Sequence, residues 1–261
     1  MGSMDREEFK RLMKPIADGL FGKQQGPRYE KPHYTVRPLN EMLKELAKVE
    51  TVDYYRYAFS RDPINGKFTD EQRKSWAKEA VKCGKEYAQK IRQQYSTSEI
   101  QTIAKKLGLD VRYPDFPNKT DRVLFAEFHE PNIVEIYMDA MKKADKFLKD
   151  ESISAIMKGH TKVSKIILAH EVFHYVEEKY SKEIFTQTEK TRLWSIGPVH
   201  NDSKVIAISE IAAMAFAEEI NELAFSPYIL DVLMVYGYDP EEASGLYEEI
   251  CGYFDKEGLQ A

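Results

Sequence analysis

Residues 166–180 read IILAHEVFHYVEEKY, which places His170, Glu171 and His174 in the order His-Glu-x-x-His. The flanking residues are strongly apolar and include no Gly or Pro, which is typical of a buried helix. Because residues four apart on a helix share a face, both imidazoles can reach one ion at roughly 2.0–2.1 Å. Glu171 lies about 100° around the helix from His170. That position is beside the ion, where a general base takes a proton from metal-bound water.

A chance match is the alternative, because short motifs recur at random and the chain has six histidines,. Two histidines and a glutamate are costly in the apolar middle of a core helix unless they are paired or ligated. The segment therefore favours a bound metal ion, and the predicted ion is Zn²⁺ with His170 and His174 as ligands.

A catalytic zinc needs a third protein ligand and one open position, and no His-x-x-Gly-x-x-His continuation follows the motif,. The best candidate is Glu210 in SEIAAMAFAEEI (209–220), a second apolar helix whose alanines allow a neighbouring helix to approach closely. A glutamate facing that neighbour is costly unless it meets a cation. Other acidic residues remain as alternatives, and each is expected to face solvent: Glu177, Glu178, Glu218 and Glu219.

Together the two segments resemble the ImmA/IrrE family of zinc metallopeptidases, compact gluzincins whose third ligand lies in a Glu-x-x-Ala-Asn-x-Phe-Ala helix. Glu210, Ala213, Phe216 and Ala217 match that pattern, whereas Met214 stands where the family usually has Asn. The resemblance covers about residues 97–225, with an apparent insertion at 139–160. It implies a cytoplasmic protease that cleaves regulatory proteins such as repressors, with Glu171 as general base and Glu210 as third ligand.

The predicted fold class is α+β, mostly helical with a small antiparallel sheet and a zincin-like core. We expect a helical N-terminal extension at 4–96 and the metallopeptidase domain at 97–261. Strands are expected only between residues 109 and 137, as a short strand followed by a hairpin. Helices are expected elsewhere, over about 5–18, 40–49, 70–95, 98–107, 139–149, 161–180, 204–224, 227–236 and 240–252. Asn40, Thr69 and Ser98 are the predicted helix starts, and Thr69 forms a capping box with Gln72.

Composition places the protein among soluble globular chains, because 31% of the residues are charged and no long apolar run is present,. Its two isolated cysteines and the lack of a secretory signal favour the cytoplasm. A net charge of −5 argues against a nucleic-acid partner,. The expected partner is a protein or peptide substrate, with no membrane association, and the oligomeric state stays open.

Two further roles are predicted near the motif. His200, in the segment between the two ligand helices, either steadies the oxyanion of a tetrahedral intermediate or is a plain surface histidine. An exposed edge strand at 123–128 could bind an extended peptide by strand addition. A non-catalytic module that binds a partner protein is the alternative function, with a surface supplied by the tyrosines at 54, 55 and 57.

Overall fold

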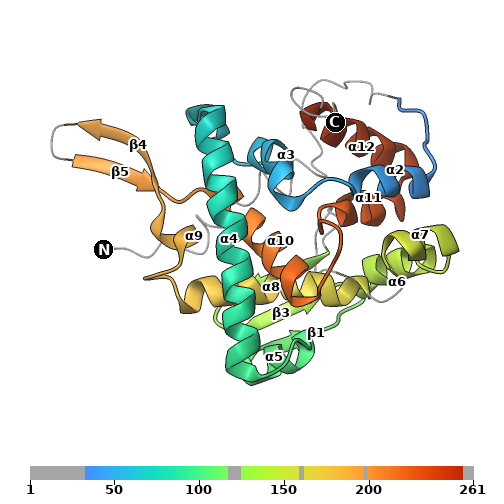
Figure 1. The fold of residues 1–261 in the computed structure, drawn as a ribbon, viewed down its shortest axis with the longest axis horizontal. Helices are drawn as coiled ribbons and strands as arrows, with labels where there is room; N and C mark the ends of the chain where they lie inside the picture. Colours follow the sequence, from blue (N-terminus) through green and yellow to red (C-terminus); the bar gives the residue numbers. More distant parts are fainter. Residues whose placement is uncertain (1–32, 117–124, 159–161, 197–198, 255–261) are drawn as a thin grey trace.

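The computed structural model describes residues 33–116, 125–158, 162–196 and 199–254 (Figure 1). Its α-helices are α2 (Leu39–Leu46), α3 (Tyr55–Ser60), α4 (Asp70–Tyr95), α5 (Ile100–Leu107), α6 (Met138–Phe147), α7 (Glu151–Ile156), α8 (Val163–Lys179), α9 (Phe185–Thr188), α10 (Ile206–Ile220), α11 (Ile229–Tyr236) and α12 (Pro240–Phe254). Its 3-10 helices and strands are η1 (Thr51–Tyr54), η2 (Asn65–Lys67), β1 (Asp110–Arg112), β2 (Ala126–His129), β3 (Ile133–Ile136), β4 (Thr191–Ile196) and β5 (Val199–Ser203). These elements confirm the α+β class.

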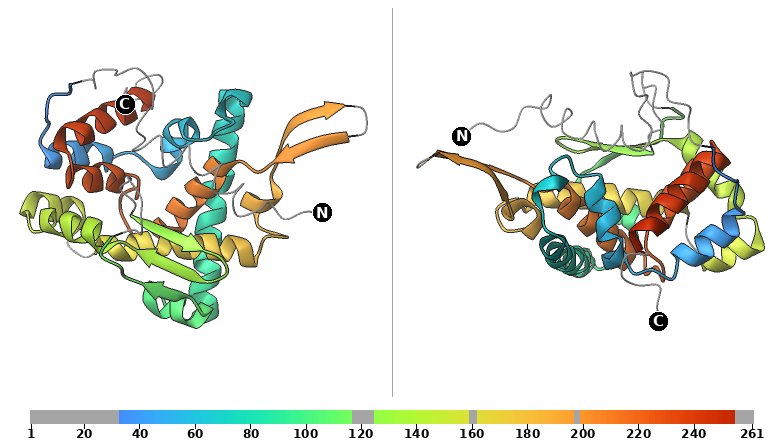
Figure 2. Two further views of the ribbon diagram at one scale, coloured as in Figure 1. Left: turned by 180° about the vertical axis from the view of Figure 1, so that it is seen from behind. Right: turned by 90° about the horizontal axis from the view of Figure 1, so that it is seen from above.

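Three layers position the two helices that carry the motifs. Figures 1 and 2 show α8 between the three-stranded sheet on one side and α10 with α4 on the other. Helix α10 is thus enclosed between α8 and α4, and α8 packs against β2 and β3. Both motif helices are consequently apolar on several faces, as expected for helices that are covered all round.

A glycine lets α4 approach the backbone of α10. A Cβ atom at Gly84 would lie only 2.2 Å from the carbonyl oxygen of Ala212 and 2.9 Å from the amide nitrogen of Phe216. The small residues of α10 therefore admit α4 as well as α8. Only a residue without a side chain fits at this crossing.

The sheet differs in part from the prediction. The predicted hairpin is present as β2 and β3, which pair antiparallel, but β1 pairs parallel with β3, so the sheet is mixed. The expectation that strands occur only before residue 138 is wrong, because β4 and β5 form a second hairpin. Strand β5 reads VHNDS, which is polar throughout after Val199, so local periodicity favoured a loop there,. Figure 1 shows this hairpin projecting from the body of the molecule.

Local signals predicted some helix boundaries and misplaced others. The capping box of Thr69 and Gln72 at the start of α4 is confirmed, and α5 ends at Gly108, which has a left-handed backbone conformation. Asn40 and Ser98 are not N-caps, because α2 follows Pro38 and α5 follows Glu99. The helix predicted at 5–18 lies outside the described residues, as do the first residues of the predicted strand at 123–128.

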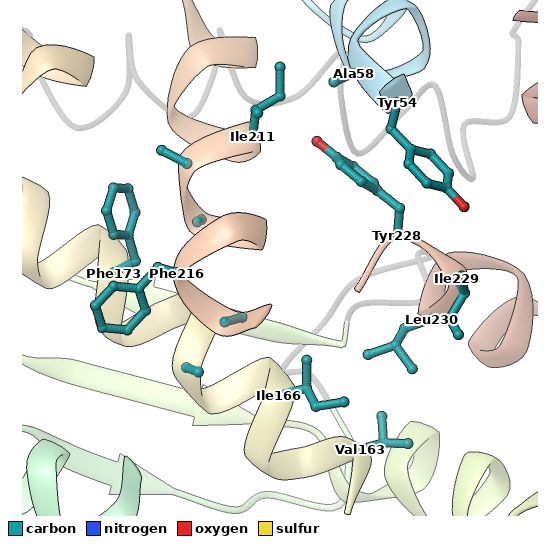
Figure 3. Packing of buried hydrophobic residues seen from close by; sticks show 14 of the residues in the cluster. Tyr54, Ala58, Val163, Ile166, Phe173, Ile211, Phe216, Tyr228, Ile229 and Leu230 are labelled. Carbon is teal, nitrogen blue, oxygen red and sulfur yellow. The ribbon is translucent and has the colours of Figure 1, made fainter. Parts of the chain in front are cut away.

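The three tyrosines assigned to a binding surface are instead part of the core. Tyr54, Tyr55 and Tyr57 are 0%, 6% and 2% exposed, and the Tyr54 ring stacks on Tyr228 with centroids 4.9 Å apart (Figure 3). The prediction of a tyrosine-rich surface is therefore wrong. The core contains residues from both sides of position 96, and the proposed division at that position stays a prediction. Among the residues described, no helix combines the length and apolar character that crossing a bilayer requires.

Candidate metal centre

Packing between two aromatic rings sets α8 against α10. Phe173 and Phe216 are fully buried, and their ring centroids are 5.5 Å apart where the helices pass each other (Figure 3). Phe173 immediately precedes the second motif histidine, and Phe216 lies six residues after Glu210. The contact that holds the helices together therefore also fixes the separation of the candidate ligands.

The start of α10 is capped by a residue distant in the sequence. Val205, at the N-cap position, has no side chain that can accept a hydrogen bond. Asp62 accepts one instead from the Ala207 amide at 3.0 Å, and its other oxygen accepts from the Ile64 amide at 2.9 Å. Burial raises the pKa of Asp62, while these amide donors oppose the rise. The loop after α3 thus anchors the helix turn that precedes Glu210.

His170, His174 and Glu210 converge as the sequence predicted. The Nε2 atoms of the two histidines are 3.1 Å apart. The two Glu210 oxygens lie 3.3 Å from His170 Nε2 and 3.7 Å from His174 Nε2. Two ligand atoms bound tetrahedrally to one zinc ion are separated by about 3.3 Å, given bond lengths of roughly 2.0–2.1 Å. The donor set and its spacing fit a zinc ion, and this group could hold a metal.

The three ligand side chains are within reach of solvent, whereas Glu171 is shielded. The side chains of His170, His174 and Glu210 are 13%, 20% and 24% exposed. Glu171 is 8% exposed. The group is therefore accessible to water, and a catalytic zinc site keeps one position for water or substrate.

A second glutamate, Glu177, contacts the Nδ1 atom of His174. The Oε2 atom of Glu177 is 3.1 Å from His174 Nδ1 and accepts a hydrogen bond from Ser209 Oγ at 2.6 Å. The prediction that Glu177 faces solvent is wrong, because this side chain is 4% exposed. A residue three positions after His174 shares its helix face, and that face is covered by α10,. The pair leaves Nε2 as the atom available to a metal.

Electrostatics in the metal-free centre favour a charged histidine between carboxylates. Burial lowers the pKa of His174, but the hydrogen bond to Glu177 and the charge of Glu210 outweigh it and raise this pKa to about 9. Burial raises the pKa of Glu210, but the hydrogen bond with His170 and both imidazole charges lower it to about 2. For Glu171, burial dominates and raises the pKa above its ordinary value. A raised carboxyl pKa is the direction that suits a general base near neutral pH.

The other acidic candidates are engaged elsewhere. Glu218 forms an ion pair with Lys85 of α4 at 2.9 Å and also accepts a hydrogen bond from Thr51. Glu219 accepts a hydrogen bond from Gln89 of the same helix at 3.1 Å. Glu178 is exposed. Of the glutamates weighed as third ligand, only Glu210 belongs to the metal-ligand group found among the described residues.

His200 lies on the projecting hairpin. It pairs across the hairpin with Ser195, its Nε2 atom is 3.3 Å from Asp202 Oδ2, and its side chain is 46% exposed. It is not a member of the metal-ligand group found among the described residues. Its predicted part in oxyanion stabilisation stays a prediction.

Two residues near the centre were missed or misjudged from the sequence. Glu177 could have been found, because its spacing from His174 places both on one helix face. Asp231 of α11, which lines a small cavity with His170, carries no local signal, since only the folded chain brings it to α8.

Comparison of the chain with protein-family models, curated proteins and solved structures finds no match. What is shown is an α+β fold with a His-His-Glu group able to hold a metal ion.

Proposed function

We propose that this protein is a zinc-dependent metallopeptidase that hydrolyses a peptide bond in a protein substrate. The observation that carries the proposal is the convergence of His170, His174 and Glu210 at the spacing of a tetrahedral ion, beside a shielded Glu171. The order of these residues along the chain is also that of the ImmA/IrrE-type pattern, whose substrates are regulatory proteins such as repressors.

Each residue has a distinct part in the proposed reaction. A bound zinc ion would supply an acidified water and polarise the scissile carbonyl. Glu171 accepts the proton from the attacking water and passes it to the leaving amine. His170, His174 and Glu210 would hold the zinc ion between the two packed helices α8 and α10. Glu177 orients His174. The raised pKa of Glu171 strengthens its affinity for that proton.

The edge of the sheet offers a place for an extended substrate. Strand β2 pairs with β3 on one side, and among the described strands none pairs with its other side. It also packs against α8. The inserted segment forms α6 and α7, which pack on α8, α11 and α2 and lie toward one end of the sheet (Figure 2). We propose that a peptide adds to β2 as a further strand, which brings its backbone along the ligand helix.

The alternative is a non-catalytic protein-binding module, and its predicted tyrosine surface is buried. A comparison of wild type with Glu171→Gln separates the two functions. Both proteins should contain equal zinc by elemental analysis. Wild type should cleave members of a mixed peptide pool followed by mass spectrometry, whereas Glu171→Gln should be slower by at least about 10²-fold. Equal cleavage by both would overturn the role of Glu171, and no cleavage by zinc-loaded wild type would favour the module.

A further inference from the structure

The Nδ1 atoms of the two candidate ligand histidines differ in their hydrogen-bond partners. His174 Nδ1 contacts the Glu177 carboxylate at 3.1 Å. His170 Nδ1 is buried and has no hydrogen-bond partner among the described residues. A buried ring nitrogen without a partner is costly, and a metal-bound histidine ordinarily donates its second nitrogen to a carboxylate, carbonyl or water.

A cavity of about 20 Å³ lies beside His170, between α8, α10 and α11. Asp231 is the only residue with a carboxylate among the described residues that line it, and His170 is among the charges that act on that carboxyl group. The volume exceeds the roughly 10–15 Å³ that one water needs. The cavity therefore has room for a single water molecule, and His170 and Asp231 both contribute to its lining.

Two neighbouring residues, Tyr57 and Met214, leave Asp231 as the group able to hold this water beside His170. Tyr57 donates a hydrogen bond to Asp231 Oδ2 at 2.8 Å, which holds the carboxylate in place. Met214 lines the same cavity, at the position where the ImmA/IrrE-type helix usually has Asn. A thioether is only a weak hydrogen-bond acceptor, so Met214 is a poor partner for a ring N–H.

We propose that Asp231 is a positioning residue, which holds His170 through one bridging water and keeps its Nε2 atom directed at the metal. The inference rests on the zinc site of the proposed function. It gives each histidine a carboxylate from a different element, namely Glu177 from the ligand helix itself and Asp231 from α11. The arrangement would couple the position of α11 to zinc affinity without direct contact between Asp231 and the ion.

The test is the affinity of the full chain for Zn²⁺ alone, measured by competition with a chromophoric chelator. Asp231→Ala should weaken zinc binding by about 10–100-fold. Asp231→Asn, which keeps the shape and a neutral acceptor, should weaken it less, and it provides the measurement if the alanine variant does not fold. Tyr57→Phe is the matched control, because it removes the tie between α3 and α11 but keeps the carboxylate, and it should have a smaller effect than Asp231→Ala.

A second readout separates positioning from a merely structural role. Nitrogen-15 spectra of the zinc-loaded protein should show His170 protonated at Nδ1 in wild type, with that signal altered in both Asp231 variants. Unchanged zinc affinity and an unchanged His170 signal in folded variants would overturn the inference, even if their melting temperature falls. If wild type itself does not bind zinc, the proposed function fails as well. If wild type binds zinc and cleaves peptides but the variants match it, only the role of Asp231 fails.

Discussion

His174 Nδ1 and Glu177 Oε2 lie 3.1 Å apart on one face of α8, and the glutamate is almost fully buried. Burial lowers the pKa of His174, but this contact together with the charges of Glu210 and Glu171 raises it from 6.5 to about 9. The pair therefore stabilises the metal-free fold fully below the unfolded-state value of 6.5, and that stabilisation is lost as pH rises through about 9,.

Zinc binding should release a proton near neutral pH. A metal binds the neutral imidazole, so the proton that His174 carries below pH 9 must leave when zinc enters,. We expect His174 to release about one proton per zinc at neutral pH, and apparent affinity to rise about tenfold per pH unit below pH 9. Calorimetry in two buffers of different ionisation enthalpy counts the protons. An affinity that is flat between neutral pH and pH 9 would contradict the raised pKa.

Replacement of Glu177 should reduce this proton release. Glu177→Gln removes the carboxylate whose hydrogen bond contributes most to raising the His174 pKa, so this pKa should fall toward 6.5 and fewer protons should be displaced at neutral pH,. Glu178→Gln is the matched control, because it makes the same change at the next position, where the side chain is exposed. The same calorimetric experiment distinguishes them, and equal proton release from both variants would contradict the pairing.

The crossing of α4 and α10 should be intolerant of a single methyl group. Gly84→Ala places a carbon 2.2 Å from the Ala212 carbonyl oxygen, and overpacking of this kind costs about 1–3 kcal/mol. Gly252→Ala is the control, because that helical glycine has open space around it, and it should stabilise by up to about 1 kcal/mol. Urea unfolding compares the two variants. A Gly84→Ala protein as stable as wild type would show that the helices are further apart.

The distant cap on α10 should affect metal binding as well as stability. Asp62→Ala removes acceptors for the Ala207 and Ile64 amides, and loss of a cap costs about 1 kcal/mol, up to about 2. Because Ala207 is in the turn before Glu210, zinc affinity should fall too. Asp150→Ala is the control, since Asp150 caps α7, which carries none of the candidate ligands, and zinc affinity should be unchanged. Equal zinc affinity in both variants would contradict the prediction that the Asp62 cap affects the metal site.

Local signals in the sequence determined the helix that carries the candidate ligands, the place of Glu171 on it and some of the helix boundaries. Their information is short-range: His170 and His174 share a face because of helical periodicity, and Thr69 with Gln72 forms its capping box within one turn. Glu210 was also predictable, because an acidic residue among alanines has few stable environments other than a cation.

Only the tertiary structure decided what surrounds those residues. The burial of Glu177, the cap from Asp62 and the cavity shared by Asp231 and His170 depend on helices that meet across long stretches of sequence. The burial of Tyr54, Tyr55 and Tyr57 is of the same kind, because tyrosine suits both an interface and a core and the sequence alone cannot distinguish them,. Periodicity shows which face of a helix is apolar, whereas the identity of the partner on that face is a property of the whole packed chain.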